Sequence, residues 1–183
     1  MVEIRRLAAA EVFERKSEFL ELLRDAIESG GTIGFLLPAD DDKLDRYWTG
    51  VAREMEAGER ELFAAFEDGK VVGSLQLAYE KAESVSHRAD LQKLFVLRDY
   101  RRRGIARSLL IEALHRMPAL GLLMFTITTR FDSPTERLVN ALRFTRWGVM
   151  PHYGVTPEGL LHDASMYYIS KATVEAVIQA HAP

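Results

Sequence analysis

The 183 residues of this chain include no cysteine. Without thiols the chain can form neither a disulfide nor a thiolate zinc site, and no cysteine nucleophile is available. The sequence has no apolar run long enough to cross a bilayer, and its first residues have no signal-peptide pattern. We therefore expect a cytoplasmic protein with no membrane partner, since the absence of thiols fits a reducing compartment.

An excess of positive charge is also missing. The chain has 24 lysines and arginines against 27 aspartates and glutamates, a net charge of −3. Such a chain is a poor candidate for general nucleic-acid binding, so we expect no nucleic-acid partner. The motifs G-x-G-x-x-G and G-x-x-x-x-G-K-[ST] are absent, which disfavours a dinucleotide fold and a nucleotide-hydrolysing loop. We expect no bound metal.

Hydrophobic residues make up 48% of the chain and charged residues 28%, which suits one globular domain with a substantial core. We place this domain at residues 1–170 and a helical extension at 171–183. Apolar periodicity and turn residues predict strands at 2–7, 61–66, 70–78, 90–97, 122–128, 149–153 and 164–169, and helices at 11–29, 40–57, 104–117, 133–143 and 173–180. The strand–helix–strand segment at 90–128 requires a parallel crossover, and the hairpin of the strands at 61–66 and 70–78 requires antiparallel pairing. The fold class is therefore α/β (α+β), with a mixed sheet and helices on both faces.

The most informative segment is the arginine-rich turn that follows the strand at 90–97. It reads R-x-x-G-x-A, with Arg101, Gly104 and Ala106 at the start of a helix. Unpaired N–H groups and the helix dipole make such a start a phosphate site, and Gly104 permits close approach by a ligand. Further charge and forked donors come from Arg102, Arg103 and Arg107. The alternative is a solvated basic turn before an amphipathic helix.

Residues 94–110, which include Leu-Phe-Val-Leu-Arg-Asp-Tyr-Arg-Arg-Arg-Gly-Ile-Ala, resemble the acetyl-CoA motif of the GNAT superfamily of N-acetyltransferases. The element order over residues 2–170 is similar to this superfamily as well. Within it, the chain looks most like the group that includes tabtoxin-resistance acetyltransferases. The pieces that carry this finer resemblance are short and lie at residues 34–38, Tyr47-Trp48, 87–90 and 151–153.

The resemblance implies a mostly antiparallel, twisted sheet whose central parallel strands splay apart into a V-shaped opening. Acetyl-CoA, as co-substrate, would lie in this opening. Its pantetheine arm would contact the backbone of Phe95, Val96 and Leu97. Its diphosphate would contact the turn and the helix start, formed by Arg102, Arg103, Gly104, Ile105, Ala106, Arg107 and Ser108. The acceptor would be a small primary amine, such as an amino acid, a metabolite or an amine-bearing antibiotic, and the protein a monomer or homodimer.

Acetyl transfer requires a neutral amine, whereas a lysine-like amine is protonated near neutral pH. A carboxylate acting directly or through water can remove the proton. We name Asp90, at the mouth of the strand at 90–97, although it could equally be a strand-end carboxylate or a partner of Arg88. Asp132 is the second candidate, with turn formation as its alternative, and it is also a candidate substrate contact together with Phe35. His87 could act as a base or a substrate contact.

Two residues depart from the family pattern. Val139 occupies the position of the usual tyrosine, which protonates the leaving thiolate, and Arg143 occupies that of a glycine. Tyr153 could donate the proton instead, although it could also be a packed aromatic at the rim. Thr128 and Phe131 differ from the tabtoxin-resistance group, so the substrate of that group is not carried over. The competing hypothesis is a non-catalytic acyl-CoA-binding or regulatory domain.

Overall fold

The computed structural model describes residues 2–180. Its elements are β1 (Glu3–Arg6), α1 (Ala9–Glu14), α2 (Lys16–Glu28), α3 (Asp41–Glu56), β2 (Arg60–Glu67), β3 (Lys70–Tyr79), β4 (Arg88–Val96), α4 (Ile105–Leu120), β5 (Met124–Arg130), α5 (Pro134–Ala141), β6 (Thr145–Val155), β7 (Leu161–Ser170) and α6 (Lys171–Ala180). Short 3-10 turns lie at Glu83–Val85 and Arg98–Tyr100. No helix within residues 2–180 is long and apolar enough to cross a membrane.

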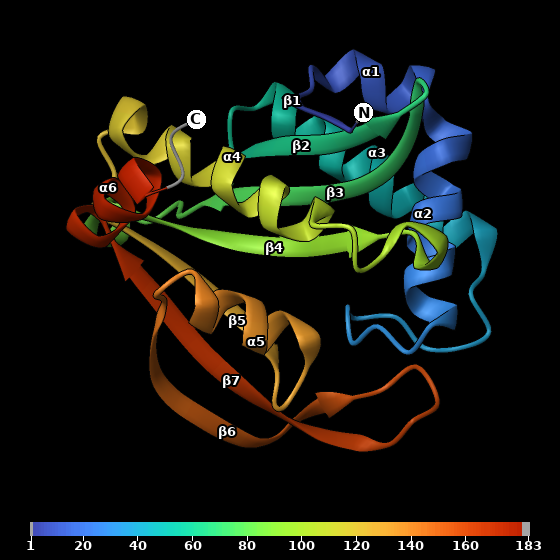
Figure 1. The fold of residues 1–183 in the computed structure, drawn as a ribbon. Coiled ribbons are helices and arrows are strands. Elements are labelled where there is room, and N and C mark those ends of the chain that lie inside the picture. The colour runs from blue at the N-terminus through green and yellow to red at the C-terminus, as the bar shows by residue number, and fades with distance from the viewer. Residues whose placement is uncertain (1, 181–183) are drawn as a thin grey trace.

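The strands form a seven-stranded sheet in the order β1-β2-β3-β4-β5-β7-β6 (Figure 1). Only the β4–β5 pair is parallel; the other neighbours are antiparallel. This arrangement confirms the predicted fold class. The β2–β3 hairpin turns at Asp68 and Gly69, both with positive φ, as a tight two-residue turn requires.

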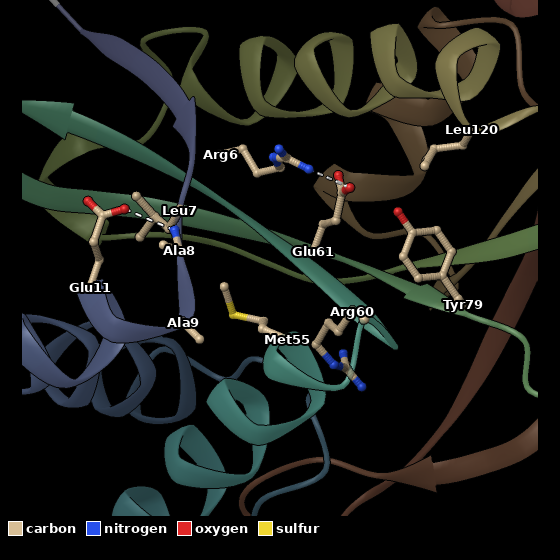
Figure 2. Close-up of a pocket in the computed structure, with 11 residues that line it drawn as sticks. Arg6, Leu7, Ala8, Ala9, Glu11, Met55, Arg60, Glu61, Tyr79 and Leu120 are labelled. Atoms are coloured by element: carbon tan, nitrogen blue, oxygen red, sulfur yellow. Dashed lines mark hydrogen bonds and ion pairs between the residues drawn. The ribbon is translucent and has the colours of Figure 1, made fainter.

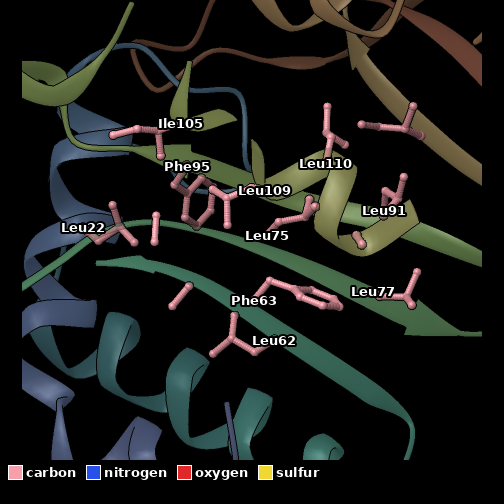
Figure 3. Close-up of a cluster of buried hydrophobic side chains, with 14 of the residues drawn as sticks. Leu22, Leu62, Phe63, Leu75, Leu77, Leu91, Phe95, Ile105, Leu109 and Leu110 are labelled. Carbon is pink, nitrogen blue, oxygen red and sulfur yellow. The ribbon is translucent and has the colours of Figure 1, made fainter. Parts of the chain in front are cut away.

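Helices cover both faces of the sheet, with α4 on one face and α2 and α3 on the other (Figure 1). Most residues of β2 and β3 are therefore buried, because neighbouring side chains point into opposite layers of the core. Figure 3 shows part of this core, where Leu75, Leu91 and Phe95 of the sheet lie beside Leu109 and Leu110 of α4.

The predicted extension at 171–183 corresponds to α6, and its residues 181–183 lie outside the described part of the chain. Val174 and Val177 of α6 are buried in the same hydrophobic core as the sheet. The helix therefore takes part in the packing of the domain.

Several element boundaries differ from the sequence prediction, most clearly at the first helix and at the last two strands. The helix expected at 11–29 is divided into α1 and α2 at Arg15, whose backbone leaves the helical region. The guanidinium of Arg15 donates to the Gly69 carbonyl at 2.9 Å and lies over the Phe66 ring. This residue is thus tied to the β2–β3 hairpin, a contact that helical periodicity cannot reveal. The last two strands are also longer than predicted, because their antiparallel pairing runs from Thr145 opposite Tyr168 to Val155 opposite Leu161.

Candidate active site

The central feature is the separation of β4 from β5. The two strands pair over three positions only, ending at Asp90 opposite Thr126. Beyond this point β5 continues beside β7, while β4 follows β3 with a register shift next to Lys93. A cavity of about 1060 Å³ occupies the opening between the diverging strands. The V-shaped opening implied by the family resemblance is therefore present.

The cavity walls come from segments far apart in the sequence. They are the loop at 29–34, β4 from 90 to 96, the turn at 100–102, the start of α4 at 104–107, β5 from 127 to 130, α5 at 133–138, and parts of the β6–β7 hairpin. The arginine turn and the strand that precedes it thus meet in one cavity, as the motif predicts.

Asp90 lies at the narrow end of this opening, at the last β4–β5 pair. Its carboxylate accepts hydrogen bonds of 2.8 Å from Thr126 Oγ1 and 2.8 Å from Gln92 Nε2. Burial raises the pKa of Asp90 above its ordinary value, while these two hydrogen bonds act in the opposite direction. A half-buried carboxylate with a raised pKa and fixed orientation is suited to accept a proton.

A polar network behind Asp90 holds Gln92 in place. Gln92 Oε1 accepts from Arg60 Nη1 at 3.3 Å, and the same nitrogen donates to Gln76 Oε1 at 2.6 Å. Arg60 is itself fixed by Glu54, 2.5 Å from its Nε. These side chains come from α3 and three adjacent strands, so they meet only after the sheet has formed.

The arginines of the turn have different roles. Arg101 donates to the carbonyl of Val96 at 2.9 Å and to Ser29 Oγ at 2.6 Å, which ties the turn to α2. Arg103 pairs with Glu67 at 2.5 Å and does not line the cavity. Arg102 does line it, and its φ of 64° shows that the turn is tightly wound.

The start of α4 opens into the same cavity. Gly104 has a φ of 83° and serves as the N-cap, with no side-chain hydrogen bond to the helix. The first intrahelical bond runs from Ser108 N–H to the Gly104 carbonyl, at 3.0 Å. The N–H groups of Ile105 and Ala106 therefore have no acceptor within the helix. Ser108, whose N–H is used, is not a lining residue.

The three residues predicted to contact pantetheine differ in their position relative to the cavity. Phe95 and Val96 line the cavity, whereas Leu97 does not. The N–H of Leu97 donates to the Val72 carbonyl at 3.0 Å, on the β3 side of the strand. Because the directions of backbone N–H and C=O groups alternate along a strand, those of Val96 point toward the opening.

The other predicted contacts are divided between the cavity and its surroundings. Tyr153 lines the cavity, with its ring 6.3 Å from that of His162. Phe35 is only 8% exposed, packs edge-on against Tyr47 and is not a lining residue. Asp132 also lies outside the cavity, in a left-handed turn where its carboxylate faces Arg137 at 3.4 Å.

The two departures from the family pattern have separate structural consequences. Val139 is fully buried in the core, and its neighbour Leu138 lines the cavity instead. A tyrosine at position 139 would therefore have to displace core side chains. Arg143 has a φ of 63°, so it keeps the left-handed conformation that a glycine adopts most readily.

Among the basic side chains that line the cavity, four were not identified from the sequence: Lys93, Arg130, Arg137 and His162. Lys93 carried a usable signal, because a lysine in the middle of a central, mostly apolar strand is unusual. The others lie at strand or helix positions where polar residues are ordinary, and no local pattern marks them.

A second cavity, of about 610 Å³, lies near β1, β2 and the end of α3. Figure 2 shows two interactions between the polar groups that line it. Arg6 pairs with Glu61 at 2.8 Å, and Glu11 accepts from the backbone N–H of Ala8 at 2.9 Å. None of the predicted site residues lines this cavity.

Comparisons with known proteins agree with this geometry. An uncharacterized N-acetyltransferase encoded in the hisH–hisA intergenic region of Azospirillum brasilense is 32% identical over 108 residues, which span 58% of this chain and 62% of that relative. An N-acetyltransferase from Staphylococcus aureus has the same fold, with a TM-score of 0.77, 16% identity and coverage of 93% of this chain and 99% of that one. The yncA protein of Salmonella typhimurium, solved with its cofactor acetyl-CoA, gives a TM-score of 0.75, 17% identity and coverage of 93% and 94%.

These comparisons do not confirm the tabtoxin-resistance group, and the resemblance to that group stays a prediction. The family itself is established by a model of the acetyltransferase (GNAT) family, which matches residues 18–140, more than half of the chain. The chain belongs to the GNAT family of acetyltransferases.

Proposed function

We propose that the protein transfers an acetyl group from acetyl-CoA to a small primary amine. The observation that carries this proposal is the arrangement of the cavity, which has Asp90 at the narrow end and the uncapped start of α4 at its wall. Asp90 offers a proton acceptor, and the start of α4 offers N–H donors for a phosphate group. Acetyl transfer from a thioester cofactor that carries a diphosphate requires both.

The cofactor is held by residues of this chain at two places. The diphosphate accepts from the N–H groups of Ile105 and Ala106, where the dipole of α4 favours negative charge. The guanidinium of Arg102 adds charge at the same wall. The pantetheine arm would lie along the edge of β4 at Val96, the side that faces the cavity. The solved relative with bound acetyl-CoA supports this choice of cofactor.

The reaction removes two protons from the ammonium nitrogen and needs a route for the departing sulfur. Asp90, directly or through one water, accepts the first proton, which leaves a neutral amine. The amine nitrogen then bonds to the carbonyl carbon of the thioester, the carbon–sulfur bond breaks with its electron pair on sulfur, and the second proton of the nitrogen passes to the thiolate. A thiolate with a pKa near 8.5 leaves without obligatory help. Tyr153, which lines the cavity, is the candidate donor of a proton to it.

The test is release of free CoA thiol from acetyl-CoA in the presence of a broad panel of amines. Asp90→Asn is expected to lower kcat at neutral pH by about a hundred- to ten-thousand-fold, the usual effect of losing a general base. Asp132→Asn is the matched control, because that carboxylate lies outside the cavity. Acetyl-CoA affinity is expected to be near normal in both. A wild-type rate in Asp90→Asn, or a large loss in Asp132→Asn only, contradicts the assignment.

The buried Val139 favours a second candidate function, a non-catalytic acyl-CoA-binding domain, because the usual proton donor is missing at that position. Tight acetyl-CoA binding together with no amine-dependent thiol release across the panel would identify this second function.

A further inference from the structure

We propose that the acceptor amine also carries a carboxylate, and that Lys93 binds this group. The inference rests on the proposed acetyl transfer and specifies its substrate class. Lys93 and Asp90 line the same cavity, three residues apart on β4. We infer that one small molecule spans them, with its amine toward Asp90 and its carboxylate toward Lys93.

The backbone of Lys93 has an unusual conformation for a lysine. Its φ is 53°, inside a strand, at the position where the β3–β4 register shifts between Ser74 and Gln76. This is a β-bulge, in which β4 has one more residue than β3. A bulge redirects the side chain of the strand, and backbone outliers of this kind concentrate at functional sites.

The ammonium of Lys93 is held without a counter-ion. Its Nζ donates to the Ile33 carbonyl at 2.6 Å, and within residues 2–180 no carboxylate lies within ion-pair distance of it. The loop passes close by, since a Cβ built on Gly34 would lie 3.8 Å from this nitrogen. An ammonium has three donors, so the Ile33 carbonyl leaves two for a ligand.

The electrostatics of the site favour an anionic partner for this ammonium. Burial lowers the pKa of Lys93, the charge of Arg60 acts in the same direction, and Asp90 opposes both. A half-buried cation without a counter-ion is costly, and a bound carboxylate would offset that cost. Within the described residues, Asp90 is the one carboxylate that lines the cavity. An acceptor with a second positive charge in place of the carboxylate would be repelled by Lys93.

The competing role for Lys93 is a tether that holds the loop at 29–34 through Ile33. The experiment separates the two roles with paired acceptors: the standard L-amino acids and their carboxamides, which keep the amine and lose the negative charge. Thiol release is measured for the wild type and for Lys93→Met, which keeps most of the apolar stem. Lys93→Arg tests whether positive charge alone restores the preference.

We expect the amino acids to be better acceptors than their carboxamides. Lys93→Met should lower kcat/KM for amino acids by about tenfold to a hundredfold, the usual effect of losing a charged hydrogen bond. The loss should come mainly from KM and leave the carboxamides nearly unchanged. Equal losses for both members of each pair would show that Lys93 is a tether and would overturn the proposal. A wild-type preference for carboxamides would also overturn it.

Failure of acetyl transfer itself can be told apart from failure of this inference. Calorimetry on the protein saturated with CoA measures binding of each amino acid and its carboxamide without turnover. If no amine releases thiol, acetyl transfer is wrong, yet carboxylate-dependent binding that is lost in Lys93→Met still supports the role of Lys93. The absence of amino-acid binding in the calorimetric assay, together with the absence of turnover, overturns both.

Discussion

The conformation of Gly104 allows the effects of strain and of phosphate binding to be measured separately. Its φ is 83°, and a Cβ built at this position would meet no atom within 4 Å. Gly104→Ala should therefore introduce no clash and should destabilise the fold by about 1–2 kcal/mol, the cost of a left-handed conformation for a residue with a Cβ. For a chain of this size each kcal/mol corresponds to about 2–4 °C in Tm.

Gly121, at the other end of α4, supplies a matched control. Its φ is 66°, and a Cβ there would also meet no atom within 4 Å. Gly121→Ala should lower Tm by a similar amount, because the backbone cost is the same. It should leave acetyl-CoA affinity unchanged, since Gly121 does not line the large cavity.

Only Gly104→Ala should weaken acetyl-CoA binding, because its methyl group would obstruct the N–H groups proposed to hold the diphosphate. Loss of one charged hydrogen bond is worth about 1.5–3 kcal/mol, so Kd should rise by about tenfold to a hundredfold. Titration calorimetry well below the Tm of both variants gives the two affinities. Equal acetyl-CoA affinity in the two variants would refute the phosphate assignment, and an unchanged Tm in both would refute the strain argument.

Three further substitutions test separate parts of the account. Arg143→Gly should stabilise the fold by up to about 1 kcal/mol in chemical denaturation, because φ is 63° at this residue and glycine removes the left-handed penalty. The gain is limited because glycine loses more backbone entropy on folding, and a destabilised variant would contradict this reasoning. Gln92→Leu removes a hydrogen bond that lowers the pKa of Asp90. The pKa of Asp90 should therefore rise further, and the acidic limb of the pH–rate profile should move to higher pH. An unmoved limb would argue against Asp90 as the base. Val139→Tyr should destabilise the fold by about 1–3 kcal/mol, the usual cost of overpacking, because Val139 is fully buried. The substitution should not raise the rate of acetyl transfer. A faster, equally stable variant would show that a side chain at this position reaches the thiolate.

Local signals predicted much of the fold and one wall of the site. The arginine turn was identified because its charge, its glycine and the following helix are adjacent in sequence. The start of α5 was equally local: Ser133 Oγ accepts from the Glu136 N–H at 3.1 Å, as a capping residue should. The carboxylate of Glu136, by contrast, accepts from Tyr167 Oη of β7 at 2.8 Å, a contact that no local pattern reveals.

The contacts that shape the acceptor end of the cavity depend on strand pairing and could not be predicted in this way. Gln92 meets Arg60 only because β2, β3 and β4 are neighbours in register. The bulge at Lys93 is likewise a property of two strands together. Phe35 was predicted to contact the substrate, whereas in the structure its ring packs against Tyr47 of α3. Its loop has no periodicity that would reveal this burial.

The central claim is that acetyl-CoA occupies the opening between β4 and β5. Hydrogen exchange with and without saturating acetyl-CoA tests it most directly, because both proposed contacts involve backbone amides. The account predicts protection at residues 94–96 and 104–107, with no change around the second cavity at residues 6–9 and 58–61. Protection at the second cavity with none at 104–107, or no protection anywhere at saturating acetyl-CoA, would contradict it.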